Sequence, residues 1–189
     1  GGDLAGTVEV IGEGVTGLTV GQEVYGMAGA TSGNGSYAEY APVSAKQLVS
    51  KPASIDFTTA AALPLAGLSA IQALIDHIGL KPDQKILIHG GAGGIGSLAI
   101  QIAKNIGAYV ATTVSVEDID YVNGLGADEV IDYKTQDFST ILKDYDAVFD
   151  NVGGETNKNM PVIKTIETLI QNVSKYPNFK VVEFDHLKT

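Results

Sequence analysis

The stretch KILIHGGAGGIGSLAIQIAKNIG, residues 85–107, decides the fold of this chain. It reads as a short apolar strand, a cluster of glycines and an amphipathic helix. Gly91, Gly93 and Gly96 fit the pattern G-x-G-x-x-G. In that pattern the first glycine permits a tight turn, the second lets the backbone approach a phosphate, and the third lets the helix pack closely.

The surroundings of this cluster favour dinucleotide binding over a glycine-rich surface turn, which the pattern alone would also fit. A strand precedes the glycines, a helix follows them, and a second apolar segment at 109–114 predicts the next strand. The helix N-terminus then offers free N–H groups and a partial positive charge to a pyrophosphate.

Strand and helix alternate from residue 85 onward. Such alternation predicts an α/β fold, a Rossmann-type doubly wound parallel sheet with helices on both faces. The predicted strands are 85–90, 109–115, 129–132 and 147–149, and the predicted helices are 94–106, 117–124 and 138–144.

The first fifty residues have the pattern of antiparallel β structure, with strands expected at 6–11, 23–26 and 37–40. A helix is expected from an N-cap at Asp56 to a break at Pro64, and a second from 67 to 78. The chain starts inside a glycine-rich motif without a methionine, so we expect further residues upstream.

Composition excludes several classes of function. The formal net charge of −10 argues against nucleic acid and anionic membranes as partners, and the absence of an apolar leader or span makes a cytoplasmic protein the expectation. Cysteine is absent, and the three histidines share no metal-ligand spacing, so no zinc is expected. His89, at the end of a buried strand, is expected to be a hydrogen-bonded structural residue.

Several further motifs resemble one family in the correct order. The chain is similar to the zinc-free branch of the medium-chain dehydrogenases/reductases, the quinone oxidoreductase-like proteins, over residues 1 to about 156. Besides the glycine turn, the matching segments are 2–8, 12–15, 20–26, 38–40, 60–64, 68–70, 126–128 and 150–154.

The resemblance implies part of a GroES-like β (substrate) domain at 1–56 and a Rossmann domain at 57–189 that is truncated or altered after 156. It also implies hydride transfer from NAD(P)H to a small quinone or α,β-unsaturated carbonyl without zinc. Because the cofactor carries the hard chemistry, no catalytic side chain is named. A homodimer is left open.

The same resemblance assigns the cofactor-binding residues. Ser69 is expected near the nicotinamide, Ser115 and Tyr133 near the adenosine 2′-phosphate, and Asn151 and Val152 along the cofactor. For Tyr133, an ordinary aromatic at a strand end is an equal alternative. The pyrophosphate is expected on Gly91, Ala92, Gly93, Gly94, Ile95 and Gly96.

Four departures from the family pattern bear on these expectations. Gln22 and Ser69 replace an aspartate and a threonine, which are mild changes. Glu117 and Asp118 stand where the family has a lysine and would repel a 2′-phosphate, although both acids can turn toward solvent. NADP(H) is therefore favoured, because no acid ends the second strand, and NAD(H) is left open. After residue 156 the family pattern is lost, although 163–170 keeps helical spacing and 179–184 has the pattern of a strand.

Two other functions remain open at this point. One is a truncated, non-catalytic cofactor-binding protein, for which this chain would be a weak or inactive catalyst. The other is an enoyl-reductase module like those of polyketide synthases.

Overall fold

The computed structural model describes residues 1–29 and 34–153. The chain separates into two compact units, Gly1–Leu68 and Ser69–Thr189, and each is described here by itself. The expected domain boundary after residue 56 falls inside the first unit, and it stays a prediction. The helix expected at 163–170 and the strand at 179–184 lie outside the described residues. Within the described ranges no helix is long and apolar enough to cross a membrane.

The first unit contains a three-stranded antiparallel sheet in the order β1-β2-β3. Its strands are β1 (Asp3–Thr7), β2 (Glu23–Met27) and β3 (Leu48–Ser50), and a short 3₁₀ turn, η2 (Ala45–Gln47), leads into β3. Gly26 has to be a glycine, because a Cβ there would overlap the backbone carbonyl of Gln47.

Two strand predictions in this unit were wrong. The expected strand at 6–11 ends at Thr7, and residues 37–40 form bends. Val10 is 82% exposed and Tyr37 is 94% exposed, so alternating apolar residues at these positions do not face a core. Alternation identifies a strand only where a partner lies beside it.

Two helices follow as the sequence indicated. Asp56 caps α1 (Phe57–Ala61), since its carboxylate accepts a hydrogen bond of 2.7 Å from the Thr59 N–H. The break at Pro64 is confirmed, but α2 (Pro64–Ile71) begins at this proline rather than at residue 67. Proline fits the first position of a helix, where its missing N–H has no intrahelical acceptor. A π-helical turn, η3 (Gln72–His77), continues α2 toward Gly79.

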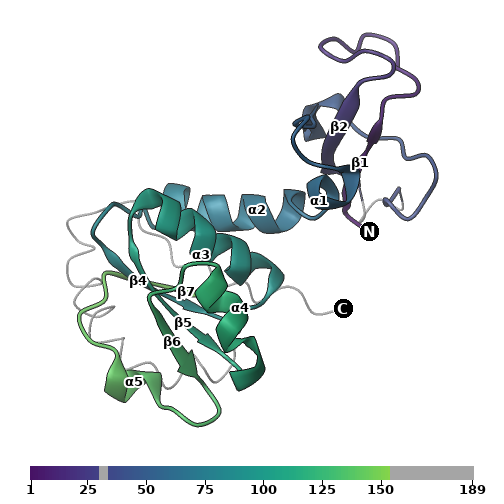
Figure 1. The fold of residues 1–189 in the computed structure, drawn as a ribbon. Helices are drawn as coiled ribbons and strands as arrows, with labels where there is room; N and C mark the ends of the chain where they lie inside the picture. The colour runs from purple at the N-terminus through teal and green to yellow at the C-terminus, as the bar shows by residue number, and fades with distance from the viewer. Residues whose placement is uncertain (30–33, 154–189) are drawn as a thin grey trace. The chain divides into compact units, whose positions relative to one another are not determined.

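The second unit is built on a parallel sheet in the order β6-β5-β4-β7 (Figure 1). Its strands are β4 (Lys85–His89), β5 (Tyr109–Val114), β6 (Glu129–Asp132) and β7 (Ala147–Asp150). The chain winds from β4 to β6 on one side and then crosses to β7 on the other, so the order reverses between β4 and β7. Ligands of open α/β sheets bind at the carboxyl ends of strands at such a switch point.

The helices of this unit are α3 (Gly94–Ile106), η4 (Val116–Asp118), α4 (Ile119–Gly124) and α5 (Phe138–Ile141). As predicted, α3 ends at Gly107, whose φ is +96°. The helix expected at 138–144 is shorter, because Leu142 is already extended and Asp144 has a φ of +59°.

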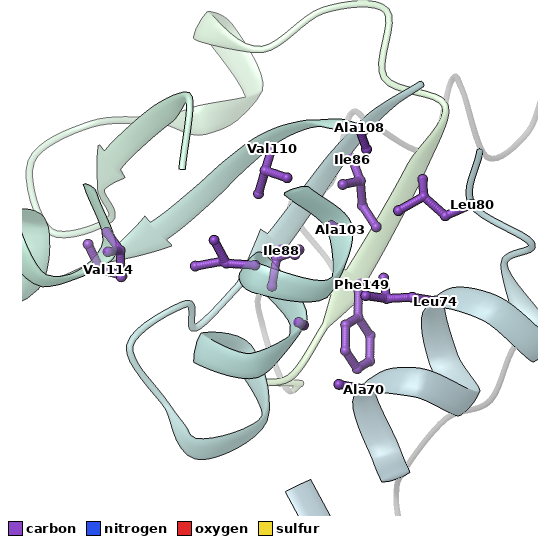
Figure 2. Close-up of a cluster of buried hydrophobic side chains, with 13 residues drawn as sticks. Ala70, Leu74, Leu80, Ile86, Ile88, Ala103, Ala108, Val110, Val114 and Phe149 are labelled. Carbon is purple, nitrogen blue, oxygen red and sulfur yellow. The ribbon is translucent and has the colours of Figure 1, made fainter. Parts of the chain in front are cut away.

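Both faces of the parallel sheet bury apolar side chains. On one face Ile86, Ile88 and Val110 pack with Leu74 of η3, with α3 and with α4, as Figure 2 shows in part. On the other face the buried residues are Leu87, Ala111, Ile131, Leu142 and Tyr145, with Phe138 of α5 packed against them. The predicted doubly wound α/β fold is therefore confirmed.

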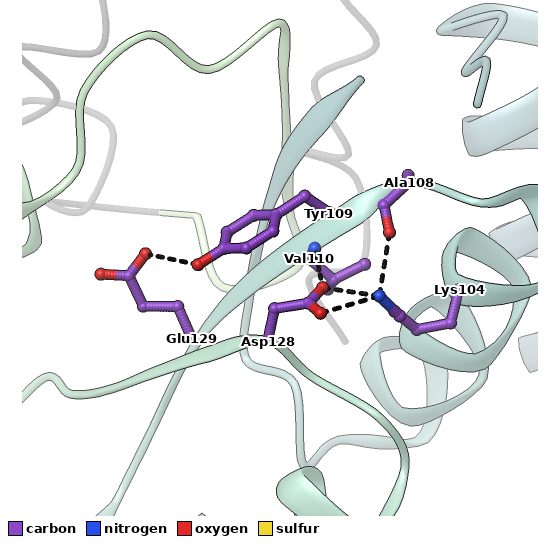
Figure 3. A network of polar contacts seen from close by, with 6 residues as sticks. All are labelled: Lys104, Ala108, Tyr109, Val110, Asp128 and Glu129. Carbon is purple, nitrogen blue, oxygen red and sulfur yellow. Dashed lines mark hydrogen bonds and ion pairs between the residues drawn. The ribbon is translucent and has the colours of Figure 1, made fainter. Parts of the chain in front are cut away.

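An ion pair fastens α3 to the strands it covers (Figure 3). Lys104 Nζ lies 2.7 Å from Asp128 Oδ2 and donates to the Ala108 carbonyl at 3.1 Å. The same Asp128 oxygen accepts from the Val110 N–H at 2.7 Å. The segment at 126–128 thus has a structural role, since it joins β5 and β6 to the end of α3.

Candidate cofactor-binding site

The glycine turn connects the carboxyl end of β4 to α3, and each glycine in it meets a different constraint. Gly90 has a φ of +68° and takes the left-handed conformation in this turn, at the position directly before the first glycine of the pattern. A Cβ on Gly91 would overlap the Thr112 hydroxyl, and a Cβ on Gly96 would overlap the Gly90 carbonyl. Gly91 therefore lets the turn lie against Thr112 of β5, Gly96 lets α3 lie against the turn, and Gly90 supplies the positive φ that the turn needs.

The N-terminus of α3 lies open beside this turn. Gly93 is the N-cap residue, no side chain caps the helix, and no acidic residue lies in its first turn. By contrast Asp56 and Asp137 cap α1 and α5 with their carboxylates. Apart from its chain neighbours and the backbone of its own helix, no heavy atom of the described residues lies within 4 Å of where a Cβ on Gly94 would be. The first N–H groups of a helix have no intrahelical acceptor, so this end of α3 fits a phosphate oxygen.

The residues at the end of β7 lie against the glycine turn, and their place along a cofactor stays a prediction. Asn151 Nδ2 donates to the His89 carbonyl at 3.2 Å. A Cβ on Gly90 would come within 3.1 Å of a methyl group of Val152, whose side chain is largely exposed. The structure thus brings Asn151 and Val152, which follow β7, next to the glycine turn, which follows β4. The switch point lies between these two strands.

The ends of β5 and β6 form the second part of the site. Tyr133 follows β6, donates its backbone N–H to the Val114 carbonyl at 3.1 Å, and exposes 58% of its surface. Ser115 Oγ lies 2.8 Å from Glu117 Oε2 and 3.0 Å from Asp118 Oδ2. Both acids therefore lie within hydrogen-bond distance of the Ser115 hydroxyl, while the Glu117 side chain stays 74% exposed to solvent.

One cation in this region was not among the expected site residues. Lys134 Nζ lies 3.9 Å from Glu117 Oε2 and 5.9 Å from the ring centroid of Tyr133. Lys134 thus places a cation at the end of β6, close to Glu117 and Tyr133. Its signal in the sequence is its place directly after Tyr133.

Three further expectations concern Ser69, His89 and a metal site. Ser69 lies on α2 and is half-buried, and its place beside a nicotinamide stays a prediction. His89 is buried at 1% exposure with its Nδ1 2.9 Å from Thr113 Oγ1, which confirms the structural reading. In the part of the chain that the structure describes, no three His, Asp or Glu side chains gather as a metal site would need.

Comparison with known proteins agrees with this architecture. The family model for the alcohol dehydrogenase GroES-like domain matches residues 1–53, and the zinc-binding dehydrogenase model matches residues 94–162. The chain belongs to the medium-chain dehydrogenase/reductase family, in its quinone oxidoreductase-like group.

Individual relatives support this assignment. The chain is 42% identical over 169 residues to the NADPH-dependent alkenal/one oxidoreductase, chloroplastic, of Arabidopsis thaliana, covering 86% of this chain and 43% of that protein. The quinone oxidoreductase of Coxiella burnetii superposes with a TM-score of 0.80 at 34% identity, covering 98% of this chain and 63% of the other. The Escherichia coli quinone oxidoreductase complexed with NADPH superposes with a TM-score of 0.76 at 32% identity, covering 84% of this chain and 50% of the other. The chain spans about half the length of the curated relatives it matches.

Proposed function

We propose that this chain binds NADPH along the carboxyl ends of β4 to β7 and serves in the reduction of a small quinone or α,β-unsaturated carbonyl. The observation that carries the proposal is the uncapped N-terminus of α3 beside the glycine turn, at the point where the strand order reverses. The Escherichia coli relative named above is a quinone oxidoreductase complexed with NADPH, which supports the same choice of cofactor.

Different residues would contact different parts of the cofactor. The pyrophosphate would accept hydrogen bonds from the first N–H groups of α3, with Gly93 and Gly94 leaving room for it. Asn151 and Val152 would border the nicotinamide side of the turn. Tyr133 and Lys134 would take the 2′-phosphate, the ring by contact and the ammonium by charge.

Bound NADPH would supply the hydride for the acceptor's carbon or quinone oxygen, and the acceptor would also take up one proton. The chain's own contribution is to position and to exclude water, because such a transfer depends on a near-attack geometry. We propose that zinc has no part, since the chain has no cysteine to hold it.

We also propose that the protein is cytoplasmic, that its substrate is a small molecule, and that it has no nucleic-acid or membrane partner. A homodimeric state is a further possibility under this proposal. The net charge of −10 supports the proposals on nucleic acid and membranes, because both partners are anionic.

Two assays test the proposal. Calorimetric titration with NADPH measures binding, and NADPH oxidation followed by absorbance with a simple quinone, and then with a short enone, measures turnover. Binding together with turnover is the expected result. Binding without turnover would favour the non-catalytic alternative, and absence of both would overturn the proposal.

A further inference from the structure

Three polar residues form a row across the parallel sheet beneath the glycine turn. Thr113, His89 and Asp150 lie at or near the carboxyl ends of β5, β4 and β7, and the register pairs His89 with each of the other two. Paired residues of neighbouring parallel strands point to the same face of the sheet. The ring of Phe138 in α5 covers His89 edge-on, with the ring centroids 4.7 Å apart.

The hydrogen bonds of Thr113 determine which nitrogen of His89 carries the proton. Thr113 Oγ1 accepts a long contact of 3.4 Å from the Gly90 N–H and lies 2.9 Å from His89 Nδ1. If Nδ1 carried the proton, the buried Thr113 hydroxyl hydrogen would have no acceptor among the described residues. The hydroxyl therefore donates to Nδ1, which leaves the imidazole neutral with its proton on Nε2. Burial also favours the neutral imidazole, because it lowers the pKa of His89. The Asp150 carboxylate partly offsets this effect.

In the described part of the chain, this tautomer leaves one donor atom and one acceptor atom without partners on two residues that the register pairs. His89 Nε2 and Asp150 Oδ2 are both buried without a hydrogen-bond partner among the described residues. The other oxygen, Asp150 Oδ1, accepts from the N–H groups of Val152 at 2.8 Å and Gly153 at 3.1 Å. One orphan atom is a donor and the other an acceptor, and buried polar groups without partners are rare.

We propose that His89 is a positioning residue of the cofactor site, held as the Nε2–H tautomer by Thr113 on one side and by the Asp150 carboxylate on the other. His89 Nε2–H donates to Asp150 Oδ2 either directly or through one buried water. Such a water would accept from Nε2–H and donate to Oδ2. This chain of contacts joins the turn at Gly90, through Thr113, to the backbone at 150–153. It thereby fixes the distance between the two segments that border the cofactor. The inference rests on the proposed function only for its effect on NADPH.

Asp150→Asn is the sharpest test because the new side chain keeps its shape. Its amide oxygen is required at the Oδ1 position by two backbone N–H groups, so its NH₂ group replaces Oδ2 and opposes the Nε2–H donor. We expect His89 to change tautomer and the Kd for NADPH to rise about tenfold, the equivalent of about 1.4 kcal/mol. Asp146→Asn is the matched control, since the Asp146 side chain also accepts a backbone N–H, from Lys85 at 2.8 Å, directly before β7 begins.

The tautomer is read from the ¹⁵N resonances of the His89 ring in the folded chain without cofactor. An unprotonated Nδ1 and a protonated Nε2 in the wild type, altered in Asp150→Asn and unchanged in Asp146→Asn, support the proposal. A protonated Nδ1 in the wild type overturns it, and so does an Asp150→Asn chain with the wild-type tautomer and the wild-type Kd.

If Asp150→Asn does not fold, Thr113→Val removes the other partner at nearly constant shape, and a wild-type ring spectrum in that variant overturns the proposal. If neither variant folds, the wild-type tautomer decides alone. A wild-type chain with the expected tautomer that does not bind NADPH would refute the proposed function while leaving this arrangement of His89 standing.

Discussion

Replacing Gly96 with alanine should destabilise the second unit, because the space for a methyl group is already taken. The new Cβ would overlap the Gly90 carbonyl oxygen and lie 2.9 Å from both the Gly90 carbonyl carbon and Gly91 Cα. These atoms belong to the backbone of the turn, so no side chain can rotate away and α3 itself must shift. Overpacking of this kind costs about 1–3 kcal/mol. In a chain of this size each kcal/mol lowers Tm by roughly 2–4 °C, so we expect a fall of about 2–12 °C.

Thermal unfolding followed by circular dichroism measures this effect. Gly124→Ala is the control, because its Cβ position has no heavy atom of the described residues within 4 Å other than its chain neighbours and its own helix backbone. In addition, α4 lies outside the candidate site. Its Tm should equal or exceed that of the wild type, since alanine favours a helix over glycine. The Gly96→Ala chain should also bind NADPH more weakly, because the first N–H groups of α3 move with the helix. A Gly96→Ala chain with an unchanged Tm would refute the close packing of turn and helix.

Four further results are expected. NADPH should bind more tightly than NADH, and the ratio of the Kd for NADH to the Kd for NADPH should increase in Asp118→Lys. If NADH binds more tightly and this substitution leaves the ratio unchanged, the choice of cofactor is refuted. Lys134→Ala should raise the Kd for NADPH by about 1.4- to 5-fold, as expected of an exposed charge worth about 0.2–1 kcal/mol, and leave that for NADH unchanged. Because burial lowers the pKa of His89 from its ordinary 6.5, the unfolded chain binds the extra proton below that pH. The free energy of unfolding should therefore fall as pH drops below 6.5, and urea titrations of His89→Leu should show a flatter dependence. Purification without a histidine tag should yield no stoichiometric zinc, and chelation should leave any turnover unchanged; metal analysis decides this.

Local signals in the sequence were sufficient for the glycine turn and for the ends of several helices. The change from strand to helix at the glycine cluster, the cap at Asp56 and the glycine at 107 all act within a few residues of the position they determine. Such features depend on backbone geometry and capping, which do not require knowledge of distant partners.

The errors concern contacts between segments far apart in the chain. Residues 8–11 and 37–40 alternate like strands, but a strand also needs a neighbour, and local periodicity does not report one. The glycine pattern did not show that Gly90 takes the left-handed conformation, because its place depends on how Gly91 packs on Thr112 of the next strand.

The same reason explains what was missed in the site. Lys134 and Glu117 follow different strands and meet only because β5 and β6 end at the same edge of the sheet. His89 was correctly expected to be buried and hydrogen-bonded. Its relation to Asp150, 61 positions further along the chain, required the register of β4 and β7.

Calorimetric titration of the wild type and of Gly93→Val with NADPH tests the central claim most directly. Gly93 has an extended backbone, with φ −71° and ψ 167°, which valine also adopts, and a Cβ there would lie 3.3 Å from the Gly90 carbonyl oxygen. The wild type should bind one NADPH per chain, and Gly93→Val should lose binding while its thermal unfolding stays close to that of the wild type. A folded wild type that does not bind NADPH, or a Gly93→Val chain that binds it with wild-type affinity, would contradict the account of the glycine turn as a pyrophosphate site.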